Sequence, residues 1–354
     1  MAETTLVEVL TDIADAIREK EGSTDLIPVS EMESRIQALS GAGFPNGTEW
    51  TRSNVTTHFQ TVSNANGLWV VGSATDAGLY YSTDGMTWLQ SNITTGAITI
   101  VRNANGVWLA GISNAGLYYS TDGMNWYKSD LADRSPNDVY NANGIWVACK
   151  YYKGLHYSAD GQTWTQSNVT SGDFKAVYNA NGIWVAVGYS YNGIYYSADG
   201  MVWTQSNVTG DNFRSIYNAN GIWVAGGYST GLYYSTDGVT WTQSDITSGT
   251  FYRIHNANGI WVAGSDAGLY YSTDGQTWTQ SNVTSGPFYS VHNANGIWAA
   301  CGGNDAGLHY STDGVTWTRG SLGVLASADV YNANGIWVLC TIQGLYYSIT
   351  WAPN

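Results

Sequence analysis

Few side chains in this sequence have the types and spacing that catalysis requires. Two paired carboxylates, one with a raised pKa, could hydrolyse a glycosidic bond. All seven glutamates lie at or before Glu49, so only aspartates remain along most of the chain. We predict that seven of these aspartates are solvated loop residues, with hydrolysis as the alternative: Asp133, Asp138, Asp173, Asp211, Asp266, Asp305 and Asp329.

The histidines and cysteines show no spacing typical of a metal site or a nucleophile. Four histidines occupy positions that are Tyr in other repeats of the chain, which favours packing: His156, His255, His292 and His309. Three cysteines share one repeat position, which indicates small buried thiols: Cys149, Cys301 and Cys340. No Asp-x-Asp-x-Asp or Cys-x-x-Cys motif occurs. We therefore predict no catalytic residue, no metal site and no cofactor.

The composition excludes several other classes of protein. The 354 residues include 42 Gly, 17 Trp and 26 Tyr but only 11% charged residues, which fits neither a disordered chain nor a helical bundle. The net charge of −14 disfavours nucleic acid and anionic membranes as partners. No apolar run of about 18 residues occurs, so we predict no membrane insertion. Glu3 and Glu8 precede any basic segment, so we predict no signal peptide.

The elements that must position any site come from an internal repeat of 37 to 39 residues. The tetrapeptide Asn-Ala-Asn-Gly occurs eight times, beginning at Asn64, Asn103, Asn141, Asn179, Asn218, Asn256, Asn293 and Asn332. The motif Ser-(Thr/Ala)-Asp-Gly-x-x-Trp follows it seven times, with its aspartates at Asp84, Asp122, Asp160, Asp199, Asp237, Asp274 and Asp313. A degraded eighth copy occupies residues 45–50.

One unit contains four short β-prone runs separated by turn signals. In the unit that starts at Phe213 the runs are 213–217, 222–225, 232–235 and 240–243. Asn-Gly between the first two is typical of a tight hairpin, and Asp-Gly marks the third turn. Four antiparallel strands repeated along a chain predict an all-β propeller, with two Trp per unit packing between blades.

The two ends of the chain predict how the ring closes. The last unit has no Asp-Gly turn, whereas residues 46–54 align with the missing fourth strand. We therefore predict an eight-bladed propeller over residues 41–354, in which segment 46–54 completes the last blade. Seven blades are the alternative if the final unit does not form and Trp351 folds back as a separate strand.

The turn motif resembles the Asp-box, or BNR repeat, of sialidases and related propellers, over residues 44–351. This resemblance implies a structural role in the turns for Asp84, Asp122, Asp160, Asp199, Asp237, Asp274 and Asp313. Sialidases combine three arginines with a Tyr–Glu pair. Here the arginines are scattered, at Arg102, Arg134, Arg214, Arg253 and Arg319, and no Glu follows Glu49. We therefore predict that the protein is not an enzyme.

Residues 1–40 differ in kind from the repeats. They contain no Trp or Tyr, and Leu6, Val9, Leu10, Ile13 and Ile17 recur at helical spacing. We predict a short helical arm whose apolar stripe packs locally or on the propeller, or else mediates attachment or oligomerisation. Residues 10–28 resemble the N-terminal segment of tail-fibre and tail-tip proteins from phages and prophages of Gram-positive bacteria. This resemblance implies a virion tail location, with synthesis in the bacterial cytoplasm, and tail proteins or sister chains as partners.

One rim of the predicted ring varies between repeats, whereas the rim with the Asn-Gly and Asp-Gly turns is uniform. The varied loops hold side chains suited to sugars: Tyr151, Tyr152, Lys153, Tyr189, Tyr191, Asn192, Tyr228, Asp266, Asn304 and Asp305. Drift of unconstrained loops is the other interpretation of this variation. The leading hypothesis is a tail receptor-binding protein that recognises a cell-surface carbohydrate of a bacterial host. The alternatives are a glycoside hydrolase and a structural tail protein that docks other proteins.

Overall fold

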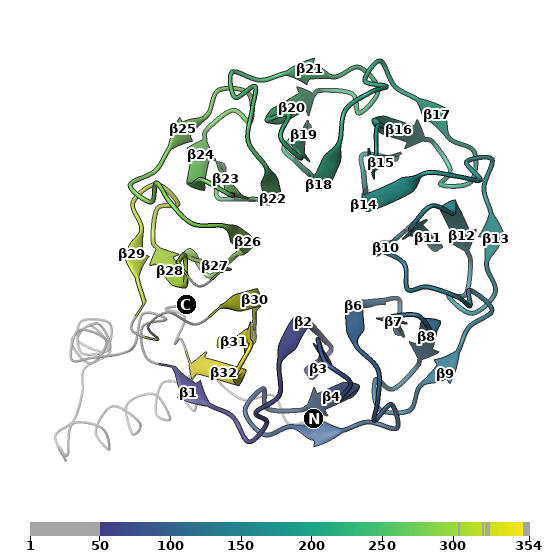
Figure 1. Cartoon of the computed structure of the whole chain (residues 1–354), viewed down its shortest axis with the longest axis vertical. Coiled ribbons are helices and arrows are strands. Elements are labelled where there is room, and N and C mark those ends of the chain that lie inside the picture. The colour runs from purple at the N-terminus through teal and green to yellow at the C-terminus, as the bar shows by residue number, and fades with distance from the viewer. Residues whose placement is uncertain (1–49, 304, 321, 323–325, 350–354) are drawn as a thin grey trace, which may run out of the picture. The chain divides into compact units, whose positions relative to one another are not determined.

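The computed structural model describes residues 50–303, 305–320, 322 and 326–349. Within these residues, strands β1 to β32 form eight four-stranded antiparallel sheets, arranged as blades around one axis (Figure 1). The prediction of an eight-bladed all-β propeller is confirmed. The predicted helical arm, residues 1–40, and Trp351 lie outside the described residues. No helix in the described part of the chain is long and apolar enough to cross a membrane.

Each of blades 1 to 7 uses four consecutive strands, beginning with β2, and blade 8 combines β30 to β32 with β1. The inner strands, nearest the axis, are β2 Phe59–Ala65, β6 Ile98–Ala104, β10 Asp138–Ala142, β14 Asp173–Ala180, β18 Phe213–Ala219, β22 Phe251–Ala257, β26 Phe288–Ala294 and β30 Ser327–Ala333. The second strands are β3 Leu68–Ser73, β7 Val107–Ile112, β11 Ile145–Lys150, β15 Ile183–Tyr189, β19 Ile222–Gly227, β23 Ile260–Ser265, β27 Ile297–Gly302 and β31 Ile336–Thr341.

The two remaining strands of each blade lie farther from the axis (Figure 1). The third strands are β4 Leu79–Ser82, β8 Gly116–Ser120, β12 Gly154–Ser158, β16 Ile194–Ser197, β20 Leu232–Ser235, β24 Gly268–Ser272, β28 Leu308–Ser311 and β32 Gly344–Ile349. The outer strands have two residues each: β5 Leu89–Gln90, β9 Tyr127–Lys128, β13 Thr165–Gln166, β17 Thr204–Gln205, β21 Thr242–Gln243, β25 Thr279–Gln280, β29 Thr318–Arg319 and β1 Thr51–Arg52.

The Asn-Gly turns join the first and second strands by the same backbone conformation in every blade. The second Asn of each motif has a φ of 51° or 52°, and the following Gly also has a positive φ. Both central residues of a type I′ turn need positive φ, which Asn tolerates and Gly adopts freely. This requirement explains why the tetrapeptide hardly varies.

The Ser-x-Asp-Gly turns join the third and outer strands through side-chain hydrogen bonds. In blade 5 the N–H groups of Val239 and Thr240 each donate to Asp237 Oδ1 at 2.8 Å, and Ser235 Oγ donates to the same oxygen at 2.8 Å. Partial burial opposes ionisation, but these hydrogen bonds lower the pKa of the Asp237 carboxyl. The same contacts recur at the equivalent aspartates of blades 1 to 7.

The two kinds of turn lie on the same side of the ring, which we call the turn rim. A Cβ built on Gly238, in the Ser-x-Asp-Gly turn of blade 5, would lie 3.1 Å from Ile183, which follows the Asn-Gly turn of blade 4. Gly275 has the same relation to Ile222 of blade 5. Each turn therefore packs against the neighbouring blade.

The hydrophobic core is divided into eight clusters, each between two adjacent blades. Val224 and Leu232 of blade 5, for example, pack against Phe251, Trp261 and Trp278 of blade 6. Both Trp residues of each unit in blades 1 to 7 are at most 9% exposed. A buried aromatic side chain contributes several kcal/mol of gross hydrophobic free energy, so stacking of neighbours stabilises the ring.

The ring closes between blade 8 and blade 1. Strand β1 pairs with β32 in antiparallel register, Thr51 opposite Tyr347 and Arg52 opposite Tyr346. The last cluster of the core then joins Val338 and Leu345 of blade 8 to Phe59 of blade 1. Residues from both ends of the chain thus share one blade, and the ring has eight blades rather than seven.

A second contact between blades repeats at the outer strands. Asn207, just after β17, accepts from the N–H of Trp241 at 2.8 Å and donates to the carbonyl of Trp241 at 2.9 Å. The same two-way contact occurs at Asn54, Asn92, Asn168 and Asn282. Asp130 and Asp245 replace Asn at two of these positions and only accept.

Candidate ligand-binding face

The loops between second and third strands lie beside the connections that enter the inner strands. Ala74 donates to the carbonyl of His58 at 2.8 Å, and Tyr228 donates to the carbonyl of Asn212 at the same distance. We call these loops and connections the loop face. In blades 3 to 6 its loops are residues 150–153, 189–193, 227–231 and 265–268. Their sequences differ, whereas the turn rim repeats.

Three predicted tyrosines on the loop face are joined by basic side chains from neighbouring blades. Lys175 lies 5.3 Å from the ring centroids of both Tyr151 and Tyr189. Arg214 lies 5.8 Å from Tyr189 and 4.7 Å from Tyr228. Tyr189 and Tyr228 also meet edge to face, at 5.2 Å. Cations at this distance from an aromatic ring are attracted by its quadrupole. We call this run of five side chains the cation–aromatic series.

The series continues at both ends through residues that the sequence patterns did not single out as ligand candidates. Arg134 lies 5.1 Å from Tyr151 in blade 3. At the other end, Arg214 lies 5.4 Å from Tyr252, whose ring is 5.0 Å from that of Tyr289. Lys175, Arg214, Tyr252 and Tyr289 occupy the same second position of the inner-strand repeat, so the repeat alignment held a signal for them.

The two central cations of the series have different partners. Lys175 Nζ lies 3.0 Å from Asp173 Oδ2, and Asp173 is buried. Among the described residues, no carboxylate forms an ion pair with Arg214, and its Nε is buried without a hydrogen-bond partner. Arg214 is instead surrounded by three tyrosine rings. The structure therefore holds an unpaired guanidinium on the loop face of a chain with net charge −14.

An open hollow of about 660 Å³ lies at the blade 3 end of the series. Its lining consists of Asp133, Arg134, Lys150, Tyr151, Tyr152 and Lys153. Five of the ten basic residues after residue 49 are on the loop face of blades 3 to 5: Arg134, Lys150, Lys153, Lys175 and Arg214. The positive charge of this acidic protein is concentrated there.

Two predicted tyrosines project from the loop face into solvent. Tyr152 is 56% exposed and Tyr191 is 74% exposed. Both have positive φ, 55° and 66°, in a region that bulky residues rarely adopt. Asn192, beside Tyr191, turns back and donates to the carbonyl of Tyr189. Its amide is thus engaged within its own loop.

The remaining predicted residues do not join the series. Asp266 accepts from the N–H of Thr250 at 3.2 Å and so caps a connection in blade 6. Asp305 lines a separate hollow of about 320 Å³ with His309, Trp317 and Arg319 of blade 7. Asn304 lies outside the described residues.

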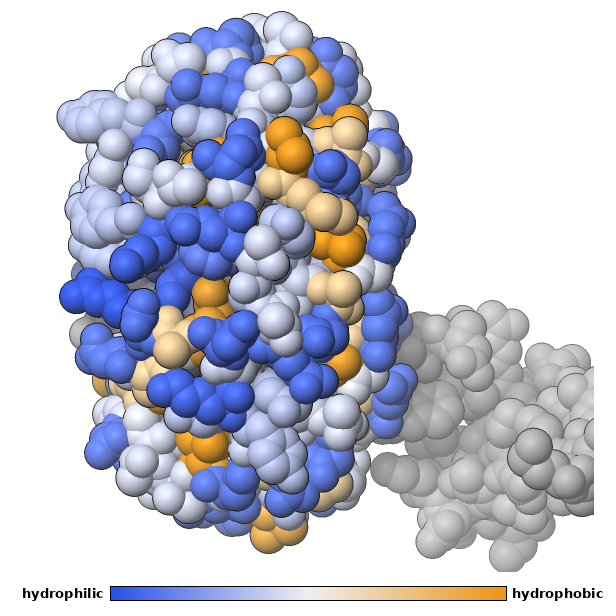
Figure 2. Space-filling view, turned by 90° about the vertical axis from the view of Figure 1, so that its right-hand side faces the viewer, coloured by the Kyte–Doolittle hydropathy of each residue, from blue (hydrophilic) through white to orange (hydrophobic). Residues whose placement is uncertain are grey.

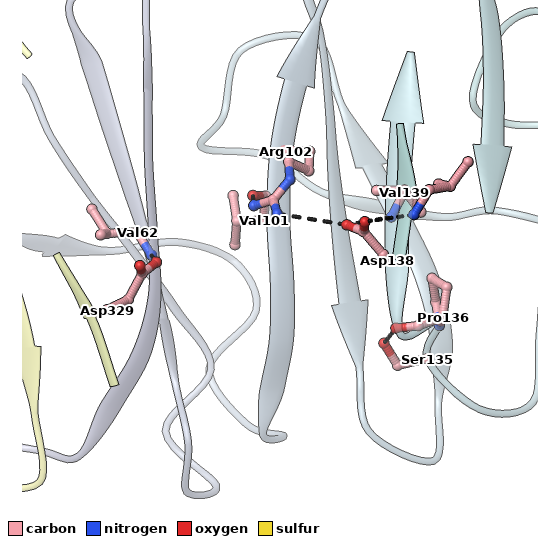
Figure 3. Close-up of polar contacts among 9 residues, drawn as sticks. Val62, Val101, Arg102, Ser135, Pro136, Asp138, Val139 and Asp329 are labelled. Carbon is pink, nitrogen blue, oxygen red and sulfur yellow. Dashed lines mark hydrogen bonds and ion pairs between the residues drawn. The ribbon is translucent and has the colours of Figure 1, made fainter. Parts of the chain in front are cut away.

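Asp138, Asp173 and Asp329 are not solvated loop residues, so that prediction was wrong for them. They belong to β10, β14 and β30. Asp138 Oδ2 accepts from the N–H of Val177 in blade 4 at 3.1 Å, and Arg102 Nη2 lies 3.5 Å from Asp138 Oδ1 (Figure 3). The neighbouring blade supplies a backbone donor at this position, which is why a carboxylate can sit in an inner strand.

Asp329 makes the equivalent contact where the ring closes. It accepts from the N–H of Val62 in blade 1 at 3.2 Å (Figure 3). It also accepts from Ser290 Oγ in blade 7 at 2.8 Å. Burial raises the pKa of both Asp138 and Asp329, while Arg102 and Arg253 act in the opposite direction. The arginines that are scattered in sequence thus share the inner strands with these two carboxyls.

The inner strands also carry six aromatic rings in sequence around the axis. They are Tyr140, Tyr178, Tyr217, His255, His292 and Tyr331, with centroid distances of 4.7, 5.2, 5.1, 5.4 and 4.7 Å between successive members. Burial lowers the pKa of His255 to about 3 and that of His292 to about 4, with Arg253 adding to both effects. Both imidazoles are therefore neutral at pH 7, as packing residues would be.

The three cysteines and two further histidines of the repeats are buried or half-buried within the blades. Cys149, Cys301 and Cys340 are buried free thiols whose pKa is raised by burial. Burial lowers the pKa of His156 and His309 to about 4. Among the described residues, no group of three or more His, Cys, Asp or Glu side chains is placed to hold a metal ion.

The outer edge of the propeller offers less to a ligand than the loop face. Figure 2 shows this edge as mainly hydrophilic, with apolar residues in small separate groups. Leu89 and Tyr127 of the outer strands are each 58% exposed. Scattered apolar residues of this kind are normal for a protein surface.

Comparisons with known proteins identify the architecture. No protein-family model matches the chain, and no curated protein sequence matches it. Among solved structures, the computationally designed Ika8 protein is similar, with a TM-score of 0.67, 10% identity, and coverage of 84% of this chain and 98% of that one. Sqt1 of Saccharomyces cerevisiae has a TM-score of 0.65 and 10% identity over 86% and 98% of the two chains. YCF48 bound to D1 peptide has a TM-score of 0.56 and 15% identity over 85% and 96%. At these identities the likeness shows the fold alone, and that fold is the eight-bladed β-propeller.

Proposed function

We propose that this protein is a non-enzymatic binding module that attaches to cell-surface carbohydrate through its loop face. The observation that carries the proposal is the cation–aromatic series, which runs from Tyr151 to Tyr228 across blades 3 to 5. It sits where the repeat varies, on a scaffold whose other rim is uniform. Binding residues commonly lie on variable loops that a rigid scaffold positions.

The chemistry of the loop face suits sugars. An aromatic face packs against the C–H face of a pyranose ring, and basic or amide groups at its border bind hydroxyl or acidic substituents. Tyr152 and Tyr191 present exposed rings for such packing. Contacts repeated on several blades would add up, because linked weak sites gain affinity through effective concentration.

We also propose that this binding serves a phage or prophage tail. The support is the resemblance of residues 10–28 to tail-fibre segments, together with the resemblance of the Ser-x-Asp-Gly turns to the Asp-box. In this proposal residues 1–40 attach the propeller to tail proteins or to sister chains. The propeller then contacts the host surface.

The test is binding of the full-length protein to Gram-positive cells and to an array of bacterial glycans. We expect Tyr189→Ala and Arg214→Ala to weaken binding by roughly tenfold each, the scale of a lost aromatic or charged contact. Tyr127→Ala, which removes an exposed ring on the outer strand β9, is the matched control and should bind normally. Absence of binding to every cell and glycan would refute the proposal. Release of new reducing ends from a bound glycan would identify a hydrolase instead.

A further inference from the structure

Lys150 is a buried lysine with no carboxylate partner in the described part of the chain. It is the last residue of β11 and only 3% exposed, whereas the second strands of blades 1, 2 and 8 end in Ser73, Ile112 and Thr341. Its ammonium donates to the carbonyl of Ala132 at 2.9 Å, and no ion pair to it occurs among the described residues. An ammonium has three donors, so the group retains hydrogen-bonding capacity in a place that water reaches poorly.

The hollow that Lys150 lines contains two further cations. Arg134 and Lys153 line it with Lys150, and Asp133 is the one acidic residue among the described residues of the lining. No ion pair within the described part of the chain joins Asp133 to any of the three cations. Burial lowers the pKa of Lys150, Asp133 counteracts this, and Lys153 adds to it. The three cations that line the hollow repel one another, and an anion bound between them would relieve that repulsion.

Aromatic rings complete the wall of the hollow. The centroids of Tyr151 and Tyr152 are 4.2 Å apart and their planes are inclined by 61°. Arg134 lies over the ring of Tyr151 at 5.1 Å, so its position is restrained by packing. The hollow therefore combines cations with ring faces, a combination that suits an acidic sugar.

We propose that this hollow is an anion subsite that binds a phosphate or carboxylate group carried by the carbohydrate ligand. Lys150 contacts the anion from below, Arg134 and Lys153 contact it from the sides, and Tyr151 and Tyr152 pack against the adjoining sugar. Arginine can bind either oxyanion with two parallel hydrogen bonds, and lysine acts as a point charge. This inference rests on the proposed function and adds that the ligand is acidic.

The test compares three polymers binding to the full-length protein: a neutral glycan, a glycan linked by phosphodiesters and a glycan that contains uronic acid. We expect the wild type to bind at least one acidic polymer roughly tenfold more tightly than the neutral one, and added salt to weaken that binding. Inorganic phosphate should compete with the phosphodiester polymer, and uronic acid monomer with the other. The polymer that binds identifies which oxyanion the subsite takes.

Lys150→Met keeps the aliphatic stem and removes the charge, and Lys128→Met on the outer strand β9 is its matched control. We expect Lys150→Met to lose the preference for acidic polymers while its unfolding temperature stays close to that of the wild type. Arg134→Met provides a second variant that does not disturb a buried group. If both variants keep the preference for acidic polymers, the proposed anion subsite is refuted.

The two proposals fail in different ways. If the wild type binds neutral glycans as well as acidic ones, the anion subsite is refuted and the proposed carbohydrate binding stands. If the wild type binds phosphate or uronic acid monomer but no polymer and no cells, the subsite is supported and the proposed function is refuted.

Discussion

The turn rim and the loop face differ in how much they vary between blades. On the turn rim, the second Asn of all eight Asn-Gly turns has the same φ to within one degree. On the loop face, blades 3 to 5 carry Lys, Arg and Tyr in loops whose sequences differ from one another. The turn residues provide hydrogen-bond partners or φ values that the backbone needs at the same points of every blade, so each copy meets the same constraint. The loop-face side chains contact one another, solvent and the backbone of their own loops, so they meet no requirement that is common to all blades. Changes on the turn rim should therefore alter stability, and changes on the loop face should alter binding.

Acid should produce the largest loss of stability, through buried histidines of the inner strands. The pKa values of His255 and His292 are lowered to about 3 and 4, so the folded state favours neutral imidazoles. The unfolded chain binds protons near pH 6.5, and stability present above that pH is lost as the pH falls towards 4. We expect the free energy of unfolding to drop by roughly 2–4 kcal/mol between pH 7.5 and 5, measured by denaturant titration.

The matched variant for this prediction carries His255→Tyr and His292→Tyr, since blades 3, 4, 5 and 8 have Tyr at this position. Its stability should vary less over the same pH range, and the remaining variation should come from His156 and His309, whose pKa burial also lowers to about 4. The turn carboxylates, whose pKa is lowered, lose their contribution only below about pH 4. A double variant as sensitive to acid as the wild type would show that other groups control the response.

The next largest effect should come from a turn-rim carboxylate. Asp237→Ala leaves the N–H groups of Val239 and Thr240 without their acceptor, so we expect a loss of about 2 kcal/mol in the free energy of unfolding. Asp266→Ala on the loop face removes a single acceptor from Thr250 and should cost less than half as much. If chemical denaturation showed the same loss in the free energy of unfolding for both variants, the distinction between the turn rim and the loop face would be wrong.

The Asn contacts at the outer strands should give a smaller change in the free energy of unfolding. We expect opposite signs for two variants. Asn207→Asp keeps the acceptor for Trp241 and loses the donor, which should cost about 1 kcal/mol. Asp245→Asn restores the missing donor to Trp278 and should stabilise the propeller slightly. Thermal unfolding of both variants checks the signs, and a stabilising Asn207→Asp would contradict the interpretation.

The smallest change in stability is expected for Tyr191→Ala. This ring is 74% exposed on the loop face, and its removal should alter the free energy of unfolding by less than about 0.5 kcal/mol. Glycan binding, measured on the same sample by calorimetry, should nevertheless weaken. Tyr127→Ala on β9 serves as the control that changes neither quantity.

Much of the fold could be predicted because its causes are local. The Asn-Gly and Asp-Gly turns require particular φ values, and the 37 to 39 residue period counts the blades. The loop face was also identifiable, since its residues vary while the turns repeat. The aspartates of the inner strands were not: Asp138 and Asp329 were predicted to be loop residues because the backbone donors that accommodate them, at Val177 and Val62, belong to neighbouring blades.

The sequence by itself determined the repeat of four strands per blade, their order and the face on which variation gathers, whereas the pairing of β1 with β32 decided eight blades rather than seven. Only the tertiary structure decided that Lys175 lies between Tyr151 and Tyr189, that Arg214 lies among three rings, and that Lys150 lines a basic hollow. The physical reason is distance along the chain. Turn conformations depend on adjacent residues, whereas these contacts join residues many positions apart, mostly on different blades, and depend on how closely the blades pack around the axis.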